Sequence, residues 1–368
     1  MSAGHPTVLH FLSGDQWAGA EVQACHLMAA LAARGRYRPR AILLCDGLPA
    51  RRLRESGIPV AVIDEGGRSF LSLVREARAL VRDWSPSLVH GHGYKENLLA
   101  WLSSRGLPVK RVRTQHGTPY PEGSFRHRLH YRLDRAAARR AFVFTIAVSE
   151  GVAAEVGRFL PAEKIVLVRN GVPAPPEEET APEASLPRGA PAVVSVGRLS
   201  AEKRFDRLID AVARLTDEFP ELRLVLVGDG PERAPLEDRA RELLGGRATF
   251  TGFQESIGPW IRRGTVYALS SDREGMPMSV LEALARGAAV AAVPVGGVPE
   301  VVRTGRTGVL AEAVSAPALA DAIAVLLRDP DLRARVGGEG RELVRREFSI
   351  DRTAGETEAV YALAEGAR

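Results

Sequence analysis

Short apolar runs alternate with longer amphipathic stretches along nearly the whole chain. Runs such as Ala41–Leu44 and Val60–Ile63 are apolar at every position, which is typical of strands in a parallel sheet covered on both faces. The stretches between such runs, for example Ala20–Ala33 and Phe205–Phe219, have the spacing of amphipathic helices. Strand and helix repeated in this order predict a doubly wound α/β fold.

One segment interrupts the alternation and predicts a domain boundary. Residues 173–191 contain six prolines and no apolar periodicity, so we interpret them as a linker. We therefore expect two Rossmann-like α/β domains, over residues 1–172 and 192–347, followed by a C-terminal helix over 348–368. Ligands of open α/β sheets bind beyond the carboxyl ends of the strands, so we expect the site in the turns there, at a cleft between the domains.

The charge is divided unequally between the two halves. Residues 1–173 hold 25 Lys and Arg against 14 Asp and Glu, a net charge of +11. The remaining residues hold 25 against 31, a net charge of −6, and the whole chain carries +5. All eight histidines also lie in the first half. This asymmetry indicates different partners for the two halves, with an anionic surface or ligand for the first.

Composition narrows the class of protein. Hydrophobic residues make up 45% of the chain, which excludes a disordered protein and is ordinary for a globular one. There is no apolar run of about 18 residues that could span a membrane, and the N-terminus does not have the pattern of a signal peptide. Two cysteines, Cys25 and Cys45, are too few for a disulfide scaffold or a zinc cluster. We expect a cytoplasmic protein.

Two turns between a strand and a helix have the composition of phosphate-binding turns. Residues 13–21 contain Gly14 and Gly19 before a helix, but they do not form GxGxxG, which disfavours a nicotinamide cofactor. In the second half, Gly197 ends a strand and the cations Arg198 and Lys203 follow, five positions apart. This pair suits a diphosphate. The alternatives are a tight turn in the first case and solvated surface charges in the second.

The most informative segment contains two glutamates eight positions apart. Glu274 lies in a turn that follows a strand and precedes Pro277, which suits the first turn of a helix. Glu282 lies on that helix among Leu281, Ala283 and Leu284. A carboxylate with apolar neighbours needs a partner, and the two hydroxyls of a ribose would serve. A capping acid plus a surface acid is the alternative, but it leaves the apolar setting of Glu282 unexplained.

Together these segments resemble the family 4 glycosyltransferases, which are retaining enzymes with the GT-B fold. The resemblance covers nearly the whole chain and is strongest over residues 192–302. It implies two Rossmann-like domains facing across a deep cleft, an acceptor-binding N-terminal domain, a nucleotide-sugar-binding C-terminal domain, and a C-terminal helix that packs back on the N-terminal domain. It is carried by the following motifs: Gly19-Ala20-Glu21, His116, Val168–Val172, Gly197-Arg198 with Lys203, Leu226–Pro231, Glu274 with Glu282, and Val295–Glu300.

The resemblance also implies roles for individual residues. Arg198 and Lys203 would hold the donor diphosphate without a metal, Glu282 the ribose, and Glu274 the hydroxyls of the transferred sugar. The other positions implied on the donor side are Gly19, Gly275, Met276, Pro277 and Met278. His116 would lie beside the transferred sugar, so His116, Arg198, Lys203 and Glu274 form the expected catalytic set, with neither glutamate assigned as nucleophile or general base. On the acceptor side we place Tyr94, Lys95 and Tyr120.

The sequence departs from the family pattern at three places, and it predicts no metal site. Ala18 stands where a first glycine is frequent, Arg204 where a glycine is common, and Ala288-Ala289 where a Gly-Pro-type turn is usual. None of these departures removes a charged ligand, although donor choice could change. His90 and His92 flank Gly91, but no third ligand is evident. We expect no metal and no cofactor other than a UDP- or GDP-sugar as the donor substrate.

An arginine-rich helix is predicted over residues 124–140. Its apolar stripe runs through Phe125, Leu129, Leu133 and Ala136-Ala137, and the other faces are basic. Such a helix can lie on an anionic membrane, and the expected membrane-facing residues are Arg126, Arg128, Arg132, Arg135 and Arg139. Peripheral attachment at the inner face of the cytoplasmic membrane would agree with a lipid-linked or lipopolysaccharide acceptor. The alternative is an ordinary helix with its apolar side in the core.

The predicted function is transfer of a sugar from a nucleotide-diphosphate donor to a hydroxyl of a glycan or lipid-linked acceptor in cell-envelope, exopolysaccharide or lipopolysaccharide synthesis. Three alternatives stay open. A nucleotide-sugar epimerase shares two α/β units, but it lacks the Arg-Lys pair and the two glutamates in this arrangement. A nucleic-acid-binding protein would suit the isoelectric point of about 9.5, but not the acidic second half. A catalytically inactive scaffold would not need all the charged positions.

Overall fold

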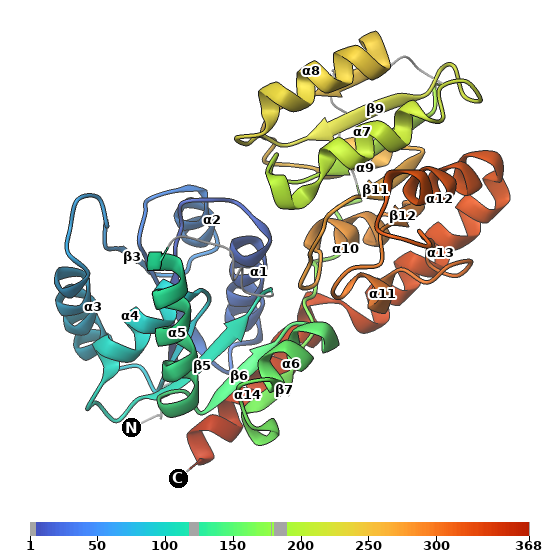
Figure 1. The fold of residues 1–368 in the computed structure, drawn as a ribbon. Coiled ribbons are helices and arrows are strands. Elements are labelled where there is room, and N and C mark those ends of the chain that lie inside the picture. The colour runs from blue at the N-terminus through green and yellow to red at the C-terminus, as the bar shows by residue number, and fades with distance from the viewer. Residues whose placement is uncertain (1–4, 118–124, 178, 180–189, 368) are drawn as a thin grey trace. The chain divides into compact units, whose positions relative to one another are not determined.

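The computed structural model describes residues 5–117, 125–177, 179 and 190–367. It divides into two units: unit 1 is Met1–Gly171 with Ile350–Arg368, and unit 2 is Val172–Ser349 (Figure 1). Most of the predicted linker lies outside the described residues. Within the described part of the chain, no helix is both long enough and apolar enough to cross a membrane.

Unit 1 is a parallel sheet with helices on both faces. Among its described residues the sheet has seven strands in the order β3-β2-β1-β4-β5-β6-β7. The strands are β1 Thr7–Leu12, β2 Arg38–Leu43, β3 Val60–Val62, β4 Leu88–Gly91, β5 Lys110–Gln115, β6 Phe144–Ala147 and β7 Ile165–Leu167. The helices are α1 Gly19–Arg34, α2 Leu48–Glu55, α3 Phe70–Trp84, α4 Tyr94–Ser104, α5 Phe125–Arg140 and α6 Glu150–Gly157.

Unit 2 repeats this architecture. Its described residues form a six-stranded parallel sheet in the order β10-β9-β8-β11-β12-β13. The strands are β8 Ala192–Val196, β9 Arg223–Val227, β10 Ala248–Phe250, β11 Val266–Leu269, β12 Val290–Ala292 and β13 Val309–Leu310. The helices are α7 Phe205–Ala213, α8 Arg233–Leu244, α9 Gly258–Arg263, α10 Met278–Ala285, α11 Val298–Val301, α12 Ala316–Arg328 and α13 Pro330–Glu347.

Alternating apolar side chains build the core on both faces of each sheet. On β1, Val8 packs in one buried cluster with residues of α1, whereas Leu9 packs in another with residues of α3. Successive residues of a strand point to opposite faces, so a continuous apolar run serves two layers of helices at once. The α/β fold class predicted from these runs is confirmed.

The last helix, α14 Ile350–Gly366, belongs to unit 1, and Figure 1 shows this red helix among the blue and green elements of that unit. It packs against α1 and β5. Tyr361 is fully buried there, and Arg34 forms an ion pair with Glu358 at 3.0 Å. The chain therefore returns to its first unit after completing the second.

Strand order reverses at one point in each sheet, between β1 and β4 in unit 1 and between β8 and β11 in unit 2. At such a point the connections leave the two neighbouring strands toward opposite faces, which opens a crevice beyond their carboxyl ends. The two functional regions described next lie at these positions.

Candidate active site

The turn after β8 holds Arg198 and Lys203, and backbone contacts with the turn after β9 fix its path. The N–H of Gly197 donates to the carbonyl of Val227 at 3.0 Å, and the N–H of Leu199 donates to that of Asp229 at 2.9 Å. Gly228 has φ +140°, and a Cβ at this position would collide with the Gly197 carbonyl. Only glycine therefore allows the two turns to approach so closely.

Lys203 and Glu274 meet at the carboxyl ends of β8 and β11. The Lys203 ammonium lies 2.7 Å from Glu274 Oε1, and the hydroxyl of Ser271 donates to the same oxygen at 2.6 Å. The Lys203 side chain is 28% exposed and that of Glu274 10%. Arg198 is exposed in the same turn. The sequence predicted the roles of these residues separately, and the structure brings Lys203 and Glu274 into contact.

Glu282 lies about one turn into α10. Burial raises the pKa of its carboxyl to about 7, and the positive charge of Arg286 opposes that rise. Arg286 itself binds Glu179 at 2.6 Å, together with Arg262, a contact that the sequence did not suggest. Among the described residues no side chain pairs with the Glu282 carboxylate. The oxygens of this carboxylate are therefore available to hydroxyl donors from a ligand.

The turn that carries Glu274 is packed against the glycines after β12. Gly296 has φ +50°, a Cβ there would collide with the Glu274 carbonyl, and the N–H of Gly297 donates to Gly275 O at 3.0 Å. The four expected donor-side residues of this turn are all buried: Gly275, Met276, Pro277 and Met278.

Arg204, one of the departures from the family pattern, has the left-handed backbone that explains why glycine is common there. Its φ is +50° and its ψ is 45°. Its guanidinium binds Asp206 at 3.0 Å and Asp272 at 3.2 Å, and these carboxylates raise its pKa. By contrast, Ala18 has an ordinary extended backbone with φ −119°, so a glycine is not required at that position.

His116, which follows β5 in unit 1, is the end of a chain of three imidazoles. His116 Nε2 lies 3.1 Å from His92 Nδ1, and His92 Nε2 lies 3.0 Å from His10 Nδ1. Burial lowers the pKa of His10 to about 3, that of His116 to about 4, and that of His92 well below its usual value. The rings are therefore neutral, and a neutral imidazole has one N–H, so the tautomer of His116 is coupled to that of His10.

His10 joins His90 and His92 in a cluster of three imidazoles. The sequence did not indicate that His10 lies beside the other two. One ring nitrogen from each of the three lies within 4.8 Å of the others. The rings already have partners in the protein, since His90 lies 2.7 Å from both the Tyr361 hydroxyl and the Thr114 hydroxyl. Metal independence stays a prediction.

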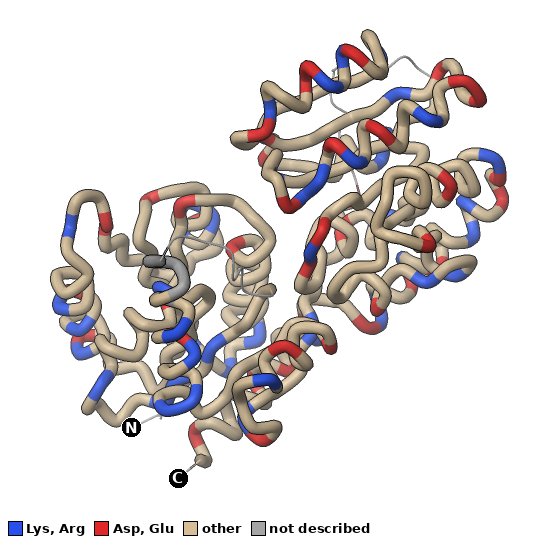
Figure 2. Tube along the Cα trace, in the orientation of Figure 1, with Lys and Arg blue, Asp and Glu red and all other residues tan. Residues whose placement is uncertain are grey.

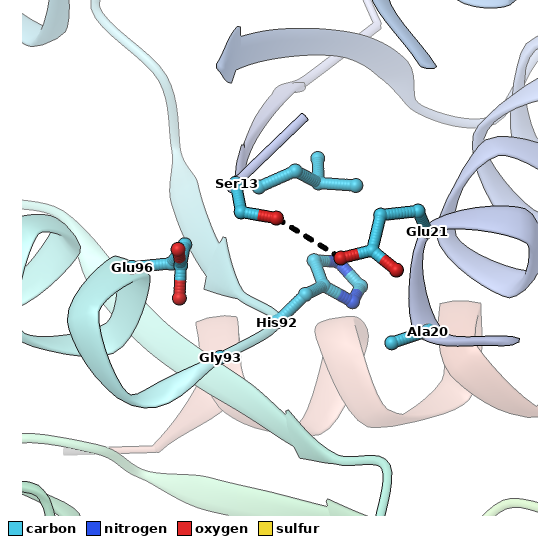
Figure 3. Close-up of a pocket in the computed structure, with 7 residues that line it drawn as sticks. Ser13, Ala20, Glu21, His92, Gly93 and Glu96 are labelled. Atoms are coloured by element: carbon cyan, nitrogen blue, oxygen red, sulfur yellow. Dashed lines mark hydrogen bonds between the residues drawn. The ribbon is translucent and has the colours of Figure 1, made fainter. Parts of the chain in front are cut away.

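A small pocket that His92 helps to line lies at the carboxyl ends of β1 and β4 (Figure 3). It is lined by Leu12, Ser13, Ala20, Glu21, His92, Gly93 and Glu96. From the sequence we did not single out Ser13 or Glu96 as site residues, and we considered His92 only as a possible metal ligand. Glu21 lies in the first motif, two positions after Gly19, the first residue of α1. Of the expected acceptor-side residues, Tyr94 is 40% exposed and Lys95 pairs with Glu65, whereas Tyr120 lies outside the described residues.

The arginine-rich helix α5 is attached to unit 1 by buried charge. Asp134 binds Arg113 at 2.8 Å, and both side chains are 1% exposed. Arg135 lies over the Phe159 ring at 4.4 Å, and Arg139 donates to the Phe159 carbonyl at 2.7 Å. Two of the expected membrane-facing arginines therefore pack against the protein.

The apolar stripe of α5 does not lie wholly in the core. Leu129 and Leu133 are 44% and 45% exposed, while Ala137 is buried. Arg132 is exposed, and the side chains of Arg126 and Arg128 lie outside the description. Figure 2 shows basic residues recurring along this helix. The stripe is therefore divided between the core and the solvent.

Comparison with known proteins agrees with this arrangement. Residues 17–174 match the family described as Glycosyltransferase Family 4, and residues 176–343 match Glycosyl transferases group 1. The alpha-maltose-1-phosphate synthase of Mycolicibacterium smegmatis is 30% identical over 79% of this chain and 81% of its own length. The lipopolysaccharide core biosynthesis glycosyltransferase LpsE of Rhizobium meliloti is 35% identical over 44% of this chain, which spans about half (47%) of that relative.

The solved structures show the same fold. HepE of Anabaena, in complex with UDP and glucose, superposes with a TM-score of 0.85 at 22% identity over 97% of this chain and all of its own. Two doubly wound units with a C-terminal helix that returns to the first define the GT-B class of folds. Within that class, the chain belongs to the family 4 glycosyltransferases.

Proposed function

We propose that the protein is a retaining, metal-independent glycosyltransferase that moves a hexosyl group from a UDP- or GDP-sugar to a hydroxyl of a glycan or lipid-linked acceptor. The family assignment favours this function over the epimerase alternative. The UDP and glucose named with HepE support the donor class, and the name of LpsE supports a role in lipopolysaccharide or other cell-envelope polysaccharide synthesis.

The residues of unit 2 would bind and activate the donor. Negative charge grows on the diphosphate as it leaves, and the fixed charges of Arg198 and Lys203 would stabilise it. The N-terminus of α10 adds a positive dipole end beside Glu274. Glu282 would accept hydrogen bonds from the ribose hydroxyls, and Glu274 from the sugar that is transferred.

Unit 1 would supply His116 and the acceptor. Because burial keeps His116 neutral, it can donate one hydrogen bond to a sugar hydroxyl but cannot bring a positive charge. Family 4 enzymes are argued to react on one face of the sugar, with the leaving phosphate helping to deprotonate the acceptor hydroxyl. In this scheme neither Glu274 nor Glu282 is a nucleophile or a general base.

The contact of Lys203 with Glu274, together with a Glu282 carboxylate that no described side chain binds, carries the proposal. A thermal-shift panel of UDP-, GDP- and ADP-sugars tests it, followed by detection of the free nucleotide on incubation with the stabilising donor. We expect one donor class to raise the melting temperature and to be hydrolysed slowly without acceptor, with or without a chelator. A panel in which no nucleotide sugar stabilises the protein would contradict the proposal.

We further propose that α5 attaches the protein to the anionic inner face of the cytoplasmic membrane. The exposure of Leu129 and Leu133 next to Arg132 supports this docking. In flotation with anionic liposomes at low salt, the protein should float, and Leu133→Ser should float less. Leu363→Ser, which changes another exposed leucine, on α14, serves as the control. A wild-type protein that stays at the bottom of the gradient would refute the docking.

A further inference from the structure

The pocket of unit 1 brings together two helix beginnings that are far apart in the sequence. Ser13 follows β1 and precedes α1, whereas His92 and Gly93 follow β4 and precede α4. Glu21 is the third residue of α1, and Glu96 is the third residue of α4. Since β1 and β4 are neighbours in the sheet, the two glutamates line the same small pocket (Figure 3).

This pocket is acidic, and neither Lys nor Arg is among the described residues that line it. The hydroxyl of Ser13 donates to Glu21 Oε1 at 3.0 Å. Glu96 is only 7% exposed, and among the described residues its carboxylate has no partner beyond the N–H of Glu96 itself. Asp15 and Glu21 add negative potential, and burial raises the pKa of Glu96 to about 7.

The cations nearest in sequence do not neutralise these acids. Burial raises the pKa of the Glu96 carboxyl overall although the positive charge of the adjacent Lys95 lowers it, and Lys95 forms its ion pair with Glu65. His92 lines the pocket as a neutral ring, because burial and the neighbouring histidines lower its pKa. A buried carboxylate normally has a cation or several donors beside it, so the missing partner of Glu96 points to a ligand.

Stabilisation of the helix ends accounts for only part of this arrangement. Acids in the first turn favour a helix, and neither α1 nor α4 has a side-chain N-cap hydrogen bond. An exposed glutamate would provide that benefit without the cost of desolvation. The benefit does not explain why both carboxylates line one pocket, nor why Glu96 is buried.

We propose that this pocket binds a protonated primary amine of the acceptor, such as that of an amino sugar or aminocyclitol, with Glu21 and Glu96 accepting its hydrogen bonds. An ammonium has three donors and one positive charge, which matches two carboxylates that lack a cation. The Ser13 hydroxyl, which lines the pocket with them, is a further acceptor. The proposal rests on the proposed function only in assigning the amine to the acceptor.

Binding of small sugars to the full chain tests this without requiring transfer. Dissociation constants for glucosamine, N-acetylglucosamine and glucose are measured by NMR titration near pH 7, where the amine of glucosamine is protonated. We expect glucosamine to bind about tenfold more tightly than either neutral sugar. Equal binding of the three sugars, or tighter binding of glucose, would overturn the proposal, and the latter result would identify a neutral polyol as the ligand.

Matched variants locate the effect. Glu96→Gln and Glu21→Gln should each weaken glucosamine binding about tenfold and leave glucose within about twofold. Glu163→Gln replaces an exposed first-turn acid of another helical segment and should change neither. An equal loss of glucosamine binding in all three variants would contradict the assignment. If a pocket variant fails to fold, the dissociation constants of the three sugars for the wild-type protein test the proposal instead.

The same samples separate this inference from the proposed function. If glucosamine is preferred but no nucleotide sugar is bound or hydrolysed, the pocket is an amine site and the proposed function fails. If a nucleotide sugar is hydrolysed but the amine is not preferred, the proposed function stands and the amine site is wrong.

Discussion

Units 1 and 2 place their polar residues at the same point of the same topology, but with different chemistry. Beyond β1 and β4 of unit 1 lie Glu21, Glu96 and a neutral His92, whereas beyond β8 and β11 of unit 2 lie Arg198, Lys203 and Glu274. The reversal of strand order determines where a ligand can enter. The residue types in the turns determine which ligand it is.

The net charge of each unit is opposite in sign to the charged side chains at its candidate site. Unit 1 has 27 Lys and Arg against 18 Asp and Glu, a net charge of +9, yet its pocket is acidic. Unit 2 has 23 against 27, a net charge of −4, yet it holds the expected diphosphate cations. A few placed side chains therefore outweigh the total charge of the unit around them.

The largest expected effect tests the cations of unit 2. Arg198→Ala should lower sugar transfer about 10²–10³-fold, because it removes a fixed charge from the leaving diphosphate. Steady-state kinetics with the donor found in the thermal-shift panel measures it. Arg335→Ala, on the exposed side of α13, is the control. A rate of sugar transfer within a few-fold of the wild-type rate would show that Arg198 does not stabilise the leaving diphosphate.

The second effect tests the imidazole chain of unit 1. His10→Phe removes the hydrogen-bond partner of His92 and should lower the rate of transfer about tenfold by releasing the tautomer of His116. His10→Asn keeps a group that can bond to His92 and should restore most of the rate. The His116 tautomer, read by nitrogen NMR, should change in the first variant only. An unchanged tautomer in both variants would show that His10 does not position His116.

The third effect separates function from stability at Glu282. Its raised pKa means that the folded protein binds more protons than the unfolded chain between about pH 4.5 and about pH 7. The carboxylate therefore lowers the stability of unit 2 as pH rises through this window. Glu282→Gln should raise the apparent melting temperature by about 2–4 °C at pH 8 and by little at pH 4.5, while it weakens donor binding.

Thermal unfolding at the two pH values measures this difference. Glu312→Gln, an exposed acid of the same unit, should leave the melting temperature unchanged at both. A Glu282 variant that is less stable than the wild type at pH 8 would mean that the carboxylate has a partner within the folded unit.

The smallest effect concerns the backbone at Arg204. Arg204→Ala keeps the left-handed strain but loses the contacts with Asp206 and Asp272, so we expect a loss of about 1 kcal/mol. Arg204→Gly loses the same contacts but relieves the strain, and its stability should lie close to that of the wild type. Equal melting temperatures for the two variants would show that backbone strain at this position does not affect the stability of the fold.

Local sequence indicates candidate site residues most directly where they lie in one turn or on the helix that follows it. Arg198, Lys203, Glu274 and Glu282 all lie at such positions. From the sequence we selected Tyr94 and Lys95 but not Glu96, which the structure places in the pocket. Consecutive helix residues point about 100° apart, so a local pattern does not show which of these three neighbours faces a pocket.

The amino-acid sequence by itself determined the α/β fold class and the family, because periodicity and turn motifs are local properties of the chain. The return of the C-terminal helix to unit 1 was expected from the family resemblance. Only the tertiary structure decided that His10 joins His92 and His116, that Glu21 and Glu96 share a pocket, and that α14 is held by the buried Tyr361 and by the ion pair of Glu358 with Arg34. Those contacts depend on which strands become neighbours, and the packing of the whole unit, rather than any local pattern, selects strand order.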